Sequence, residues 1–254
     1  MKSFLRLLRK DLEASRWPMG FLSAITLGIM LLVSLKIATG GWPTQAAVAA
    51  VTFPLVFLPL WVLWQSFQTL RTEWREDTVY TLLVLPEPGW KIMLAKLSAI
   101  LLEYTVLLVV TVVGMLIFFF PMVQEAMLVL PGAGWVVRNG ILLYVFSLFM
   151  IASTIIFVQL AFVVSKMVGR LQGLVALWTL LLSGWLVDRL GILLEPLFGW
   201  IPTIPVHTLF RLNELKQGMV ADWNIAPEIG TWLGTLALLV LTSYIFEHYV
   251  EVNG

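Results

Sequence analysis

The sequence contains no cysteine among its 254 residues. It therefore cannot form a disulfide, a thiolate metal site or a cysteine nucleophile. Histidine is also scarce, since His207 and His248 are the only two, and neither belongs to an HExxH motif. A GxSxG motif and a GxxxxGK[ST] phosphate loop are absent as well. We therefore expect no catalytic residue and no metal site, and any ATP hydrolysis is expected in another chain.

Charge is also sparse. Charged residues make up 12% of the chain and hydrophobic residues 60%, and the mean hydropathy is +0.94. Soluble domains are typically about half apolar and about a quarter charged. This chain has more apolar surface than one soluble core can hide, which indicates an integral membrane protein. Membrane lipid is the expected surrounding, and no nucleic acid is expected as a partner.

Six apolar runs are long enough to cross a membrane, which takes about 20 residues for roughly 30 Å of hydrocarbon. They lie near residues 18–37, 46–68, 97–120, 139–164, 171–188 and 228–246. The runs are continuous and lack the alternating polarity of a β-barrel, so helices are expected. The sequence therefore predicts an all-α fold, a single transmembrane domain over residues 1–254 with six membrane-spanning helices.

The orientation follows from the distribution of lysine and arginine. With these boundaries, eleven of the 16 basic residues fall on one side of the membrane and five on the other. The larger group is Lys2, Arg6, Arg9, Lys10, Arg16, Arg71, Arg75, Lys91, Lys96, Lys166 and Arg170. Because cytoplasmic segments carry the excess of basic residues, both termini are predicted to be cytoplasmic.

The first 16 residues have the pattern of an amphipathic helix. Phe4, Leu5, Leu8 and Leu12 fall within one 100° arc, and the basic side chains lie opposite. Such a helix lies in the headgroup plane, with its cations near anionic lipid. Residues 1–16 are therefore predicted to form an interfacial helix. It is either a simple positive-inside anchor or an elbow that braces the protein against a partner.

Two further features stand out. Glu103 is the only acidic residue deep inside a predicted span, which makes it a functional candidate by default. Pairing with a neighbouring helix or snorkelling is the alternative. The connection 189–227 is long, apolar and broken by proline, so re-entrant or interfacial helices are expected there. This outer loop is interpreted either as a gate over a translocation path or as a loop that lies on the membrane.

The segment 69–92 separates two membrane-length runs and carries seven charged residues. These are Arg71, Glu73, Arg75, Glu76, Asp77, Glu87 and Lys91. Such a segment must lie in water, where a soluble partner can dock. Val79, Leu82 and Leu83 stand at i, i+3 and i+4, which makes one apolar stripe if the segment is helical. A partner surface or the lipid headgroups would have to cover this stripe.

Several residues of this region match a family pattern in order. They are Glu73, Arg75, Thr78, Leu82, Leu83, Pro86 and Lys96, with Asp77 at a position that is usually glycine. In this pattern, and in its six runs and amphipathic start, the chain resembles the membrane subunit of type-2 ABC transporters. The resemblance covers nearly the whole length.

The resemblance implies that residues 78–85 form a short coupling helix that ends at Pro86 and sits in a groove of a cytoplasmic ABC ATPase. Glu73, Arg75, Glu76 and Asp77 would be flanking polar contacts. It further implies two ATPase copies, which bind the ATP and Mg, and a second permease chain in a homo- or heterodimer. The chain itself would bind no cofactor. The expected setting is an exporter in a bacterial plasma membrane.

The same resemblance places the second and fifth spans beside the pathway, so Gln65 and Trp178 join Glu103 as candidate pathway residues. A rival interpretation is a membrane scaffold whose charged loop only recruits a soluble protein. A stand-alone intramembrane enzyme is disfavoured because no catalytic cluster is present.

Overall fold

The computed structural model describes residues 2–76, 87–129, 132–168, 170–201, 203–205 and 222–248. The described chain is helical apart from one pair of two-residue strands and short connections. Six of its helices are long and apolar enough to cross a membrane. The prediction of a multi-pass, all-helical membrane protein is therefore confirmed. The chain divides into two compact units, residues 1–155 and 156–254, which are described separately.

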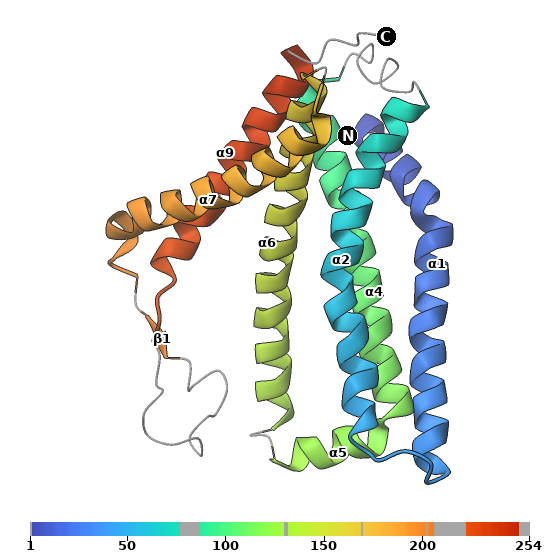
Figure 1. The fold of residues 1–254 in the computed structure, drawn as a ribbon. Helices are drawn as coiled ribbons and strands as arrows, with labels where there is room; N and C mark the ends of the chain where they lie inside the picture. Colours follow the sequence, from blue (N-terminus) through green and yellow to red (C-terminus); the bar gives the residue numbers. More distant parts are fainter. Residues whose placement is uncertain are drawn as a thin grey trace. The chain divides into compact units, whose positions relative to one another are not determined.

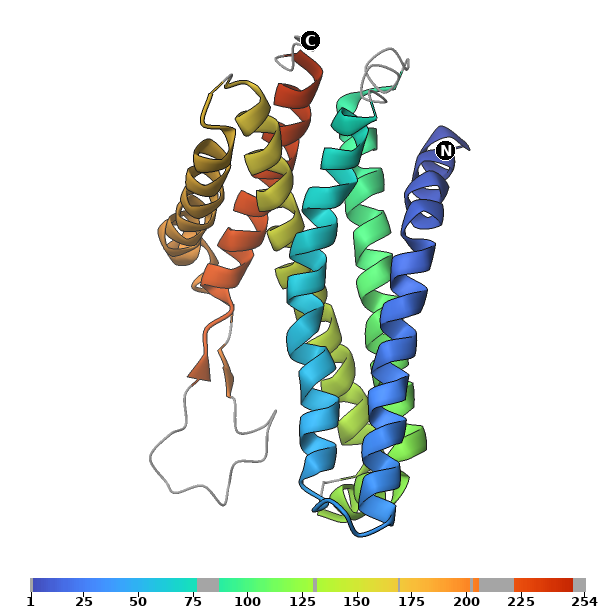
Figure 2. The same cartoon turned by 45° about the vertical axis from the view of Figure 1, so that its right-hand side comes forward.

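The first unit is built on three long helices, α1 (Lys2–Ala38), α2 (Ala46–Arg75) and α4 (Gly89–Phe118). They run side by side in both views (Figures 1 and 2). After α4 the short helix α5 (Phe120–Val129) turns across the end of the bundle (Figure 1). The unit also contains the first part of α6 (Ala133–Lys166).

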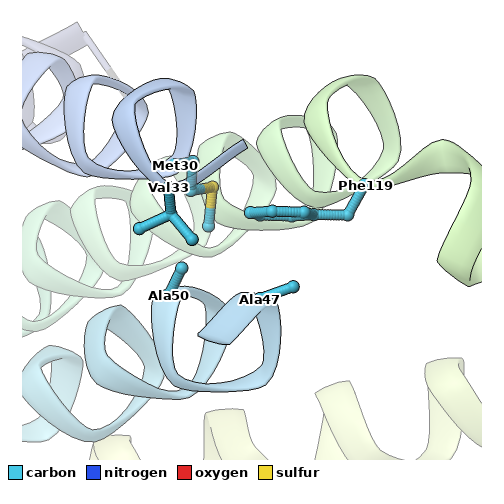
Figure 3. Close-up of a cluster of buried hydrophobic side chains, with 5 residues drawn as sticks. All are labelled: Met30, Val33, Ala47, Ala50 and Phe119. Atoms are coloured by element: carbon cyan, nitrogen blue, oxygen red, sulfur yellow. The ribbon is translucent and has the colours of Figure 1, made fainter. Parts of the chain in front are cut away.

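A small apolar cluster closes the end of this bundle near α5. Met30 and Val33 of α1 meet Ala47 and Ala50 of α2, and Phe119 joins them from the junction of α4 and α5 (Figure 3). Alanines on α2 leave room for the larger side chains that face them. Nearby, a Cβ added at Gly114 of α4 would lie 2.7 Å from the Met30 sulfur, so α1 and α4 approach closely there.

The second unit contains the end of α6, then α7 (Gln172–Phe198) and α9 (Ala226–His248). Between them, β1 (Ile204–Pro205) pairs with β2 (Asp222–Trp223) in antiparallel orientation. Helices α7 and α9 cross in Figure 1 and lie beside each other in Figure 2. The crossing is close, because a Cβ added at Gly230 of α9 would lie 2.8 Å from the Cα of Gly191 of α7.

Two predicted boundaries differ from the structure. Residues 2–16 and the first span form one helix, α1, which bends in its first part (Figure 1) and contains Pro18. Proline lacks the N–H of a regular helix and commonly causes such a bend. The outer loop predicted to begin at residue 189 begins later, because α7 continues to Phe198. Contact with α9 supports this extra length, since a Cβ added at Gly230 of α9 would lie 3.2 Å from the Cβ of Leu194. In addition, Asn224, two residues before α9, donates to Glu195 at 2.7 Å. Residues 206–221 of that loop lie outside the described residues.

Candidate functional site: a buried charge cluster and the cavity beside it

Glu73 is the centre of a charge cluster at the end of α2. It is 5% exposed, although it stands two residues before the last residue of the helix. Lys10 Nζ of α1 donates to both carboxylate oxygens, at 2.9 Å to Oε1 and 3.1 Å to Oε2. Lys96 Nζ of α4 donates to Oε1 at 3.1 Å. One carboxylate therefore joins three helices.

Lys96 is even more buried than its partner, at 3% exposure. Besides Glu73, its ammonium group faces Asp11 Oδ1 at 3.5 Å and the carbonyl oxygen of Thr69 at 3.4 Å. An ammonium group has three donors, so each can be directed at one of these acceptors. Burial of an ion is costly unless it is paired and hydrogen-bonded. The acceptors therefore make the burial of Lys96 tolerable and fix the start of α4 against α1 and α2.

The other end of the charged segment also contacts α1. Lys91, in the first turn of α4, donates to Glu87 Oε2 at 2.7 Å. Hydrogen bonding to Lys91, and then to Ser3 of α1, lowers the pKa of the Glu87 carboxyl. The two ends of the segment that links α2 to α4 are thus both in contact with the N-terminal part of α1.

A cavity of about 490 Å³ lies next to this cluster, between α1 and α2. Its α1 wall includes Asp11 and Ser15, and its α2 wall includes Trp61, Gln65 and Thr69. The α2 residues recur every four positions, which places them on one helix face. The cavity is therefore a recess with both polar and apolar walls, between helices of membrane-spanning length.

Glu103 lies deeper in the bundle, behind this recess. It follows Lys96 by seven residues, or about 10 Å along α4, and is 2% exposed. Gln65 Nε2 donates to Glu103 Oε1 at 3.3 Å. In the described part of the chain, Glu103 Oε2 and the indole nitrogen of Trp61 are both buried without a hydrogen-bond partner. Gln65 and Glu103, predicted separately as pathway candidates, are therefore neighbours.

The other predicted site residues are distributed as follows. Arg75 is the last residue of α2 and Glu76 follows it, and both are exposed. Trp178 is on α7, in the second unit, and is 57% exposed. The remaining predicted coupling residues lie outside the described residues: Asp77, Thr78, Val79, Leu82, Leu83 and Pro86.

Sequence reasoning missed Lys10 and Asp11 as parts of this cluster. Lys10 is predicted only as one cation on the polar face of the N-terminal helix, whereas it pairs with a residue 63 positions away. The sequence indicates this contact only indirectly, because it places the charges of the N-terminal helix on the same side of the membrane as Glu73 and Lys96. Within the described residues, no group of three His, Asp or Glu side chains is placed to hold a metal ion.

Comparison with known proteins adds no relative. No protein-family model, no curated protein and no solved structure matches this chain.

Proposed function

We propose that this chain is the membrane-spanning permease subunit of an ATP-driven ABC exporter. It works with two copies of a separate cytoplasmic ABC ATPase, which bind ATP and Mg, and with a second permease chain. The observation that carries the proposal is the charge cluster around Glu73, because it connects the ends of the segment 77–86 to three membrane-length helices.

The cluster supplies a mechanical connection for such a machine. An ATPase that pushes on residues 78–85 moves the end of α2 at Glu73 and the start of α4 at Lys96. These ends are joined to each other and to Lys10 of α1, so the three helices move together. Buried, hydrogen-bonded ion pairs have a defined geometry and are costly to break. Movement of the segment is therefore passed into the bundle instead of being absorbed in side-chain rearrangement.

The remaining parts of the proposal rest on the distribution of basic residues and on the resemblance to the type-2 permeases. The docking segment and both termini are cytoplasmic, and the membrane is the plasma membrane of a bacterium. The translocation path lies at the interface with the second permease chain, with Gln65, Glu103 and Trp178 as candidate pathway residues. Asp77 and the stripe of Val79, Leu82 and Leu83 contact the ATPase.

The test is a pull-down from cells that express the tagged chain together with an ABC ATPase encoded beside it. Replacing both Leu82 and Leu83 by Asp puts charge on the apolar stripe. Loss of a central hydrophobic contact costs about 2 kcal/mol or more, so ATPase recovery should fall by roughly thirtyfold. The matched control is the Thr81→Asp, Val84→Asp chain, which adds the same charge on the opposite side of the expected helix.

Membrane insertion should be the same in both variants, and the control should recover the ATPase normally. Equal recovery of the ATPase by both variants would contradict the coupling assignment. Recovery of a soluble protein without ATPase activity would instead support a membrane scaffold.

A further inference from the structure

The cavity between α1 and α2 has two chemically different regions. At the charge cluster, Lys10 and Lys96 stand against Asp11 and Glu73, so the positive and negative groups balance. Toward the middle of the bundle the polar side chains that line the cavity are uncharged, and Glu103 lies behind them. None of the ion pairs in the described residues includes Glu103. An acidic group without a cation of its own therefore lies behind the wall of the deeper region.

The neighbours of Glu103 belong to the wall of the cavity. Its carboxyl group is bordered by Ser15, Trp61 and Gln65, and all three line the cavity. Gln65 donates a hydrogen bond to Glu103 Oε1, whereas Glu103 Oε2 is buried and has no hydrogen-bond partner among the described residues. A buried acceptor without a partner costs roughly 1–3 kcal/mol, and more for a charged group. A ligand that carries positive charge would remove this cost.

Aromatic side chains complete the recess. Trp61 and Trp64 both line it, and Trp64 is 56% exposed. Tryptophan offers the best aromatic face for an organic cation, through the negative charge of its ring surface. The volume of about 490 Å³ lies within the range of small-molecule sites, which is roughly 300–1,000 Å³.

We infer that this cavity binds an organic monocation, an ammonium or related onium group, with Glu103 as counter-ion and Trp61 and Trp64 as aromatic walls. The four charges of Lys10, Asp11, Glu73 and Lys96 balance one another, and Glu76 is an exposed acidic residue at the same end of the lining. Glu103 is the buried acidic group without a cation, behind the wall that Trp61 and Gln65 form, so the cation is expected to bind against that wall. The group belongs either to a free amphipathic cation or to the amine of a lipid headgroup. The inference does not depend on the proposed transport function, because binding is measured on the chain without an ATPase.

The test uses the full chain, purified in dodecyl maltoside, with radiolabelled tetraphenylphosphonium as the probe in equilibrium dialysis. Saturable binding by the unaltered chain is expected. Glu103→Gln keeps the shape and the hydrogen-bonding ability of the side chain but removes its charge, and it should weaken binding at least tenfold. The matched control Glu125→Gln makes the same change at an exposed position of α5 and should leave binding unchanged.

A second pair of variants does not depend on whether the Glu103 variant folds. Trp64→Leu changes a half-exposed side chain of the cavity and should weaken binding several-fold. Trp185→Leu changes a tryptophan of α7 with 57% exposure and should have no effect. The absence of saturable binding by the unaltered chain would overturn the inference. So would equal binding by the unaltered, Glu103→Gln and Trp64→Leu chains.

Competition identifies the source of the cation. Displacement of the probe by phosphatidylethanolamine, but not by phosphatidylglycerol, would assign the site to a lipid amine. Displacement by neither lipid would assign it to free organic cations. Both results support the inferred site.

Discussion

At the scale of single residues, Glu73 links three helices, since it is the acceptor that Lys10 of α1 and Lys96 of α4 share. Glu73→Gln removes its charge. Among the described residues, Lys96, at 3% exposure, then keeps only the 3.5 Å contact to Asp11 as an ion pair. Breaking a buried pair by removing one partner costs about 3–5 kcal/mol. We expect a clearly lower midpoint of thermal unfolding in detergent, measured by scanning fluorimetry.

The control for this variant is Glu13→Gln. Glu13 pairs with Arg9 at 2.7 Å, but both side chains are mostly exposed, and exposed pairs contribute little. The midpoint should therefore hardly change. If Glu73→Gln unfolds at the same temperature as Glu13→Gln, the cluster does not hold the three helices together, and the mechanical argument for coupling loses its basis.

At the scale of elements, the crossing of α7 and α9 depends on residues without side chains. A Cβ at Gly191 would lie 2.6 Å from Thr231 Cγ2 and 2.9 Å from the carbonyl oxygen of Pro227. Small residues allow such close approach between membrane helices. Gly191→Ala should therefore lower the stability of the second unit, by about 1–3 kcal/mol for an overpacked contact.

Gly173→Ala is the matched change on the same helix. Nothing lies within 4 Å of a Cβ at Gly173, so the variant gains the helix propensity of alanine without a clash. Its thermal unfolding midpoint should equal or exceed that of the unaltered chain, whereas Gly191→Ala should unfold earlier. Equal midpoints for the two variants would show that α7 and α9 can move apart at no cost.

At the scale of the whole molecule, orientation is the property to test, and the absence of cysteine makes the test simple. Glu76 lies at the end of α2 beside the charge cluster, and Glu125 lies on α5 at the opposite end of the first unit (Figure 1). Both are exposed. The excess of basic residues predicts that the end of the unit near Glu76 is cytoplasmic. An impermeant thiol reagent should therefore react with Glu76→Cys only after the membrane has been permeabilised.

Glu125→Cys should react with the same reagent in intact cells. Detection is by mass shift of the purified chain, and the cysteine-free parent is the blank for both variants. Labelling of Glu76→Cys from outside, together with protection of Glu125→Cys, would reverse the orientation. It would then place the proposed ATPase-binding segment on the wrong side of the membrane.

The sequence by itself determined the class of protein and the number of membrane-length helices. Hydrophobic length is a property of consecutive residues, so runs such as 97–120 and 228–246 can be read without a fold, and α4 and α9 cover most of each. The isolation of Glu103 within a span was equally visible. Helix ends were less predictable: α7 passes Asp188 and Arg189 because its backbone hydrogen bonds and its contact with α9 continue there.

Only the tertiary structure decided which charges meet. The sequence offers 16 basic and 15 acidic residues, and nothing local selects Lys10, 63 positions away, as the partner of Glu73. That choice follows from how α1, α2 and α4 pack, because packing brings particular helix faces together. The same holds for Gly191 and Gly230, which matter only because α7 and α9 come into close contact at these two residues. It also holds for Gln65 and Glu103, which become neighbours only when α2 lies against α4.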